Sequence, residues 1–145
     1  MLLARQSPRV AVAVVISWPK TVKSKPGAPD AAGFEGLSRE EYERFPSFWS
    51  DATLRRWDLW GYVDARDVAQ SCRLALEADV GAEQFIVAAA DTVMNRPSAE
   101  LMAEVYPSVR YRPSPGKFDT LLSIKKARKL LSYEPEWSWR DQMAD

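Results

Sequence analysis

The apolar residues of this chain follow two patterns, unbroken runs and spaced stripes. The runs cover residues 10–16, rich in Val and Ile, and residues 84–89, which read Gln-Phe-Ile-Val-Ala-Ala. Short unbroken runs of β-branched and aromatic residues are typical of buried strands. The pattern therefore predicts a strand at each of these two places.

Four further segments, near 38–45, 64–78, 97–106 and 124–131, have the features of helices. The segment at 64–78 has the clearest helical spacing, with polar residues on the opposite side. We expect its buried stripe to contain Ala65, Val68, Ala69, Cys72, Ala75 and Leu76.

Polar residues and prolines mark the ends of these helices. Ser38 and Ser123 stand where N-caps are expected, and Asp64 is suited to cap the longest helix. Pro97 fits the first turn of the third helix, because the N–H that it lacks would be unpaired there. Pro46 is expected to end the first helix.

Two proline-rich connections separate the predicted elements. Residues 17–37 contain three prolines, three glycines and three lysines, and loops of this length are uncommon. Residues 106–118 contain Arg110, Arg112 and Lys117. The pattern favours solvated connections in both places, with contact to an anion as the alternative.

The composition excludes several classes of protein. The chain has 145 residues with 20 Lys and Arg against 20 Asp and Glu, which argues against sequence-independent binding to nucleic acid. The absence of histidine excludes Ser-His-Asp and Cys-His catalysis and His-ligated metals. The single cysteine, Cys72, excludes an internal disulfide, and its place on the predicted stripe indicates a small core residue.

Membrane and targeting signals are weak. The apolar run at 10–16 is far shorter than the roughly 20 residues that span a bilayer. The residues after it, Trp18 to Lys20, provide no small-residue cleavage site, so a strand is favoured over a signal peptide. We expect a cytoplasmic protein without membrane contact. A membrane-associated or secreted protein that uses residues 1–18 is the alternative.

Three segments in the second half of the chain match one family in order and spacing. Residues 60–70, Trp-Gly-Tyr-Val-Asp-Ala-Arg-Asp-Val-Ala-Gln, resemble the strand-to-helix signature of the extended short-chain dehydrogenases/reductases, the NAD-dependent epimerase/dehydratase family. Residues 123–135, with a Lys-Ala pair and a Tyr-Glu-Pro ending, resemble the closing helix of that family. Residues 85–90 and 96–98 resemble the strand, loop and helix between them.

This resemblance implies an α/β protein with a partial Rossmann-like fold, the C-terminal substrate-binding lobe of such an enzyme. It divides the chain into a helix end and parallel strand at 1–18, a loop at 19–37 and the lobe at 38–145. The Gly-rich loop and the Tyr-x-x-x-Lys motif of the family are not in this sequence. NAD or NADP serves the family, but we expect neither to bind this chain alone and expect no turnover. In such a partial fold the strand at 10–16 would expose an edge, which predicts a homodimer or marginal stability.

The resemblance also implies a small-molecule substrate, such as a nucleotide sugar or another carbonyl or hydroxyl compound. Arginines pair with phosphate or carboxylate, and aromatic rings stack on sugars or bases. The candidate contacts are Phe48, Trp49, Arg55, Arg56, Trp57, Trp60 and Arg96. Core or interface packing is favoured for the aromatic residues, and solvation or pairing with Asp51 and Asp58 for the two adjacent arginines.

A non-enzymatic binding module is the alternative function. It would use the aromatic cluster at 45–62 against a partner, and it predicts an exposed patch formed by Trp49, Trp57 and Trp60.

Asp64 and Asp67 suggest an acid pair or a metal site, since residues three apart share a helix face. Both lie at the start of the predicted helix, where capping and the helix dipole favour acidic residues. The structural interpretation is therefore favoured over a metal.

Overall fold

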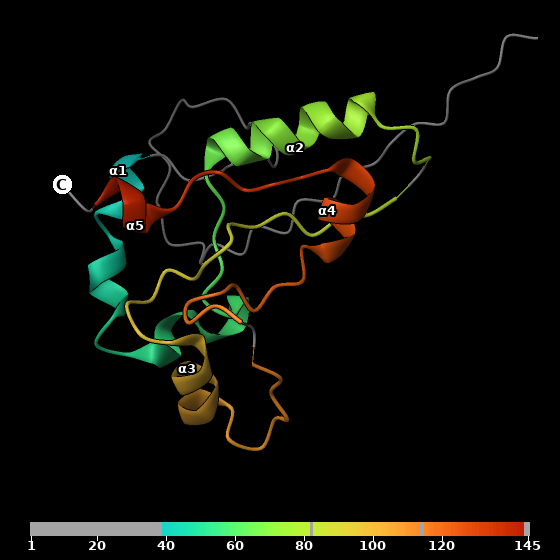
Figure 1. The fold of residues 1–145 in the computed structure, drawn as a ribbon. Coiled ribbons are helices and arrows are strands. Elements are labelled where there is room, and N and C mark those ends of the chain that lie inside the picture. The colour runs from blue at the N-terminus through green and yellow to red at the C-terminus, as the bar shows by residue number, and fades with distance from the viewer. Residues whose placement is uncertain (1–38, 82, 114, 144–145) are drawn as a thin grey trace, which may run out of the picture.

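The computed structural model describes residues 39–81, 83–113 and 115–143. In these residues the chain forms five α-helices and two 3-10 helices, joined by irregular segments (Figure 1). In chain order they are α1 (Arg39–Tyr42), η1 (Phe45–Phe48), η2 (Ala52–Asp58), α2 (Ala65–Glu77), α3 (Ser98–Val105), α4 (Lys125–Leu131) and α5 (Trp139–Gln142).

The α/β fold expected from the resemblance is wrong for the described residues, which contain helices and no strand. The predicted strand at 84–89 is instead an irregular segment whose apolar side chains are mostly buried. Its backbone makes single hydrogen bonds, such as Ala89 N–H to the Tyr62 carbonyl at 2.8 Å, rather than the repeated ladder of a sheet. An isolated antiparallel bridge joins Asp91 and Asp119. The strand at 10–16, whose exposed edge suggested a homodimer, lies outside the described residues.

The N-terminal part of the described chain is a series of short helical turns. Pro46 lies in the first turn of η1 and does not end a helix as predicted. The carboxylate of Asp51 caps η2 by accepting the Thr53 N–H at 2.8 Å. The predicted strand at 10–16 and the Ser38 cap lie outside the described residues, as do the first two divisions of the chain.

Helix α2 confirms the strongest helix prediction, including its cap. The Asp64 carboxylate accepts the Arg66 N–H at 2.8 Å, and the helix then runs for 13 residues. Short acidic caps of this kind satisfy an N–H that the first turn leaves unpaired.

The buried face of α2 differs from the predicted stripe. Asp67, Val68, Ser71 and Ala75 are buried, whereas Leu76 is 83% exposed. The sequence pattern treats polar residues as exposed, but the Ser71 hydroxyl donates to the Val68 carbonyl at 2.7 Å and is satisfied inside. The helix is therefore rotated from the orientation that its apolar residues predict.

Helices α3 and α4 confirm the predicted elements with a correction at the start of each. Pro97 is the N-cap of α3 and so precedes the first turn in which it is expected, while Leu101 on the predicted apolar face is fully buried. The predicted Ser123 cap is wrong, because α4 begins after Ile124 without a side-chain cap. Ser132 ends α4 with a left-handed φ of 57°, the conformation that glycine most often supplies at this position.

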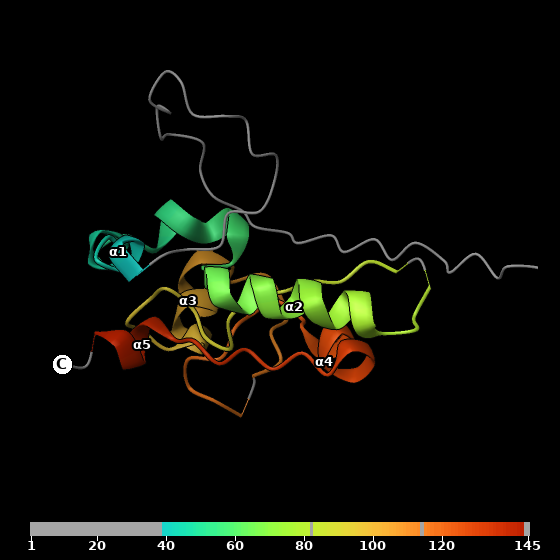
Figure 2. The same cartoon turned by 90° about the horizontal axis from the view of Figure 1, so that it is seen from above.

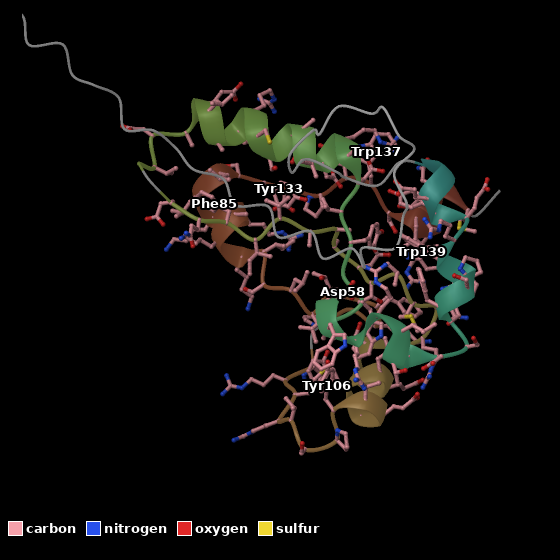
Figure 3. The ribbon with its side chains drawn as sticks, turned by 180° about the vertical axis from the view of Figure 1, so that it is seen from behind. Asp58, Phe85, Tyr106, Tyr133, Trp137 and Trp139 are labelled. Atoms are coloured by element: carbon pink, nitrogen blue, oxygen red, sulfur yellow. The ribbon has the colours of Figure 1, made fainter. Side chains whose placement is uncertain are left out.

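Two apolar clusters hold the described chain together. The first lies among the short helices and α5 and is rich in aromatic rings. It includes Tyr42, Phe45, Trp60, Tyr62 and Trp139, together with Met94 and Leu101. The second lies between α2 and α4: Val63, Val68, Ala75, Phe85, Val87, Ile124, Ala127, Leu131 and Tyr133. Figures 1 and 2 show α4 beside one end of α2 and α1 beside α5. In Figure 3, Phe85 and Tyr133 mark the second cluster, while Tyr106 lies at the opposite end, next to α3.

Candidate functional site

An open groove runs from the end of α3 to the start of α4 in two adjoining parts. The larger part has a volume of about 570 Å³ and lies between residues 111–113 and 119–128. The smaller part, of about 460 Å³, lies against α3. Tyr111, Arg112 and Leu121 line both parts, so they form one surface. These volumes fall within the roughly 300–1,000 Å³ typical of small-molecule sites.

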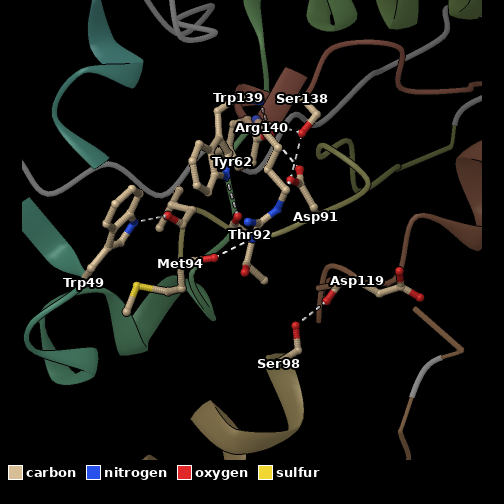
Figure 4. Close-up of polar contacts among 11 residues, drawn as sticks. Trp49, Tyr62, Asp91, Thr92, Met94, Ser98, Asp119, Ser138, Trp139 and Arg140 are labelled. Carbon is tan, nitrogen blue, oxygen red and sulfur yellow. Dashed lines mark hydrogen bonds and ion pairs between the residues drawn. The ribbon is translucent and has the colours of Figure 1, made fainter. Parts of the chain in front are cut away.

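Contacts with the core fix one wall of the groove. The Thr120 N–H donates to the Ala90 carbonyl at 2.8 Å. The Ser98 hydroxyl, at the start of α3, donates to the Asp119 carbonyl at 2.8 Å (Figure 4). The Asp119 carboxylate in turn accepts the Gly116 N–H at 3.0 Å, and a Cβ on that glycine would stand 1.8 Å from a carboxylate oxygen. This wall is therefore held from two sides.

The larger part of the groove carries three cationic side chains, Arg112, Lys125 and Arg128, and one acidic side chain, Asp119. Arg128 forms an ion pair with Glu134, with 3.1 Å between the two charged groups. Within the described chain, neither Arg112 nor Lys125 forms an ion pair with a carboxylate. Hydroxyl groups from Thr120 and Ser123 also line this part. Cations and hydroxyl groups around a concave surface favour an anionic ligand.

The smaller part of the groove is apolar. Its lining includes Leu59, Met102, Tyr106, Val109 and Leu121. The Tyr106 hydroxyl donates to the Arg56 carbonyl at 2.7 Å. The ring of Tyr106 packs against that of Trp60, with 6.2 Å between the ring centroids. Because its hydroxyl is engaged and one side packs on the core, Tyr106 has a fixed ring at this end of the groove.

The three tryptophans proposed as substrate contacts occupy three different environments. Trp60 is fully buried, and its indole N–H donates to the Ala52 carbonyl at 2.7 Å. Trp49 is half-buried and donates to the Val93 carbonyl at 2.9 Å. Trp57 is 79% exposed. The exposed three-tryptophan patch that a binding module would require is therefore not formed.

The two adjacent arginines also differ from each other. Arg55 is 3% exposed, and its guanidinium binds the Asp58 carboxylate at 2.6 Å and the Gly61 carbonyl at 2.8 Å. This confirms the predicted pairing with Asp58, although the pair is buried. Arg56 is half-buried and lies over the exposed ring of Trp57, with 4.5 Å from the guanidinium carbon to the ring centroid. Phe48 packs under the Arg55 guanidinium at 5.3 Å.

Arg96 forms an ion pair with Glu104 and lies 4.0 Å from the Glu100 carboxylate. The Glu100 and Glu104 carboxylates on α3 therefore balance the charge of Arg96. None of the seven candidates lines either part of the groove. The residues chosen from the sequence do not come together as one site.

Asp64 caps α2 and pairs with Arg66. Besides the Arg66 backbone, its carboxylate accepts hydrogen bonds from the Arg66 guanidinium and the Tyr42 hydroxyl. Burial alone would raise the pKa of Asp64, but these hydrogen bonds outweigh it and hold the pKa below its ordinary value.

Asp67 joins α2 to the C-terminal segment. Its two carboxylate oxygens accept the N–H groups of Glu136 at 3.0 Å and Trp137 at 3.2 Å. Burial raises the pKa of this carboxyl. Across the part of the chain that is described, no group of three acidic or cysteine side chains could hold a metal ion. The structural interpretation of the two aspartates is therefore the one that their contacts support.

A second polar network ties α5 to the core. Asp91 accepts hydrogen bonds from the hydroxyls of Tyr62 at 2.6 Å and Ser138 at 2.9 Å, and pairs with Arg140 at 3.0 Å (Figure 4). Burial raises the pKa of Asp91, although these partners oppose it. Burial also raises the pKa of Tyr62 above its ordinary value. The Tyr62 hydroxyl, bonded to Asp91 and to the Trp139 N–H, therefore positions α5 against the core.

The sequence indicates part of the groove. Arg112 belongs to the connection at 106–118, whose cations are predicted to be solvated, with contact to an anion as the alternative. The sequence around Lys125 and Arg128 does not indicate a binding site, because the exposed face of any amphipathic helix has such residues. They become a candidate site when the fold brings the loop at 111–113 against α4.

Comparisons with protein-family models, curated proteins and solved structures find no match to this chain. The family resemblance therefore stays a prediction from the residues that carry it. None of the helices described here has the length and apolar character needed to cross a membrane.

Proposed function

We propose that this chain binds a small anionic molecule in the groove between α3 and α4 and does not itself convert that molecule. One observation carries the proposal. A concave surface of about 570 Å³ is lined by Arg112 and Lys125, neither of which forms an ion pair with a carboxylate of the described chain. Cations beside hydroxyl groups in a concave wall are the chemistry that recognises phosphate and carboxylate.

Each of the polar groove residues would make a different contact with the anion. The planar guanidinium of Arg112 suits a bidentate contact with two oxygens of one anion. The Lys125 ammonium supplies a compact charge from the other wall. The hydroxyls of Thr120 and Ser123 can donate to the remaining oxygens. The wall that carries them is fixed through Ser98 and Asp119.

The family resemblance supports the same class of ligand. Lys125 and Arg128 belong to residues 123–135, the segment that resembles the closing helix of the NAD-dependent epimerases and dehydratases. Nucleotide sugars, one substrate class implied by that resemblance, carry phosphate groups. In this proposal the chain supplies substrate contacts. NAD or NADP chemistry would need the Gly-rich loop and the Tyr-x-x-x-Lys motif, which this sequence does not contain.

Calorimetric titration of the full chain with UDP-glucose and with inorganic phosphate tests the proposal. We expect saturable binding that Arg112→Ala and Lys125→Ala each weaken by about tenfold or more, since a hydrogen bond to a charged group contributes about 1.5–3 kcal/mol. Arg110→Ala removes the same charge from the same connection without touching the groove, and should change the affinity less than about twofold. Binding of neither probe, or an equal loss in Arg110→Ala, would overturn the proposal.

The absence of turnover has its own test. The purified chain, mixed with NAD or NADP and the same nucleotide sugar, should produce no reduced cofactor by absorbance. Cofactor reduction that increases with protein concentration would show that the chain catalyses a redox step.

A further inference from the structure

We infer that the ligand of this groove joins an apolar ring to its anionic group, with the ring beside Tyr106 and the anion beside Arg112 and Lys125. This inference rests on the proposed anion binding and adds the second half of the ligand. It follows from the contrast between the two parts of the groove, which share lining residues and differ in chemistry.

In the apolar part of the groove, carbon atoms of the protein would surround a ligand ring on several sides. Leu59, Met102 and Leu121 contribute aliphatic or thioether side chains, and Val109 is exposed at the edge. The Tyr106 hydroxyl already donates to the Arg56 carbonyl, so the contact that Tyr106 can make with a ligand is through its ring. Water gains few hydrogen-bonding partners in such a place, so a ligand that displaces it is favoured.

The position of Arg112 links the two halves of the predicted ligand. It lines both the cationic and the apolar part, as do Tyr111 and Leu121. A guanidinium can accept an anion at its edge while its flat face packs against an aromatic ring. Inorganic phosphate would therefore use the cationic part alone, and a ligand with an attached ring would use both.

Matched probes separate the ring from the anion. Phenyl phosphate and inorganic phosphate carry the same anionic group, and the full chain can be titrated with each by calorimetry. We expect phenyl phosphate to bind at least about tenfold more tightly, because ring burial adds to the same ionic contact. Val109→Ser should remove about threefold or more of that preference and leave the phosphate affinity unchanged.

The variants have internal controls. Leu76→Ser replaces another exposed aliphatic side chain, on α2 and away from the groove, and should leave both affinities unchanged. Arg112→Ala should weaken both probes. Equal affinity for the two probes would overturn this inference and leave the proposed anion binding intact. Binding of neither probe would overturn the proposed function itself.

Discussion

The carboxylate of Asp91 accepts a hydrogen bond from the phenol of Tyr62, with 2.6 Å between the two oxygen atoms. The phenol oxygen also accepts the backbone N–H of Trp139 at 3.1 Å. Tyr62 therefore connects Trp139, at the start of α5, with Asp91, which follows the buried run at 84–89. Tyr62 and Trp139 lie 77 positions apart in the sequence.

Tyr62→Phe tests the contribution of this hydroxyl. The substitution leaves Asp91 without one of its donors and Trp139 without its acceptor, so we expect the free energy of unfolding to fall by about 1–3 kcal/mol. Urea denaturation followed by tryptophan fluorescence measures it. Tyr111→Phe is the matched control, since its hydroxyl makes no hydrogen bond within the described residues, and it should cost less than about 0.5 kcal/mol. Equal losses in the two variants would contradict the assignment.

Asp64→Asn tests the cap of α2 through its pH dependence. Hydrogen bonds hold the pKa of Asp64 below its ordinary value although burial opposes them. A lowered pKa in the folded state stabilises the fold above the unfolded value of about 3.9, and this contribution disappears as the pH falls through the folded pKa. At pH 7 the variant should be less stable by about 1–3 kcal/mol.

The difference between the wild type and Asp64→Asn should therefore shrink between pH 7 and pH 3, as measured by urea denaturation. Asp79→Asn, at an exposed position after α2, is the control and should track the wild type at both pH values. A difference that stays constant over this range would show that the Asp64 charge does not stabilise the fold.

Trp57 and Trp60 provide a test of the aromatic segment. Trp60→Ala empties a fully buried site and should cost about 3–5 kcal/mol. Trp57→Ala removes an exposed ring that contacts the Arg56 guanidinium, and should cost less than about 1 kcal/mol. Thermal and urea unfolding of both variants measure the contrast. A large loss in Trp57→Ala would show that this ring packs against more of the chain than its exposure indicates.

The helices could be predicted from the sequence because their signals are local. The Asp64 cap and Pro97 both act within one helical turn; the cap is confirmed, and Pro97 lies at the N-cap of α3, one residue before the predicted first turn. The fold class could not be predicted in this way. The apolar run at 84–89 correctly indicates burial, but a strand needs a neighbour that pairs with it repeatedly, and the run itself contains no information about that neighbour.

The candidate site could be predicted less well than the helices. The groove combines Leu59, the residues around Arg112 and the start of α4, which lie far apart in the sequence. Arginine is suited to anion binding, but the type of residue does not show whether a carboxylate of the same chain already pairs with it. Arg55 has such a partner in Asp58, whereas Arg112 has no carboxylate partner in the described chain.

The buried pair of Arg55 and Asp58 leads to a last prediction, with the next arginine as its control. Burial raises the pKa of Asp58, although Arg55 opposes the shift. Arg55→Ala leaves this carboxylate without its cation, so we expect a loss of about 3–5 kcal/mol at neutral pH. Arg56→Ala removes a half-buried side chain that lies over an exposed ring, and should cost about 1 kcal/mol or less.

The pH dependence of Arg55→Ala separates a lost charge partner from lost packing. Without Arg55 the folded-state pKa of Asp58 rises further above its unfolded value, which makes the protonated form the stable one in the fold. A raised folded pKa means that stability is retained at low pH and lost as the pH rises through that pKa. The variant should therefore lie closer to the wild type at pH 5 than at pH 8 in urea denaturation. If the loss is the same at both pH values, Arg55 stabilises this turn through packing, and the charge of Asp58 is not the cause.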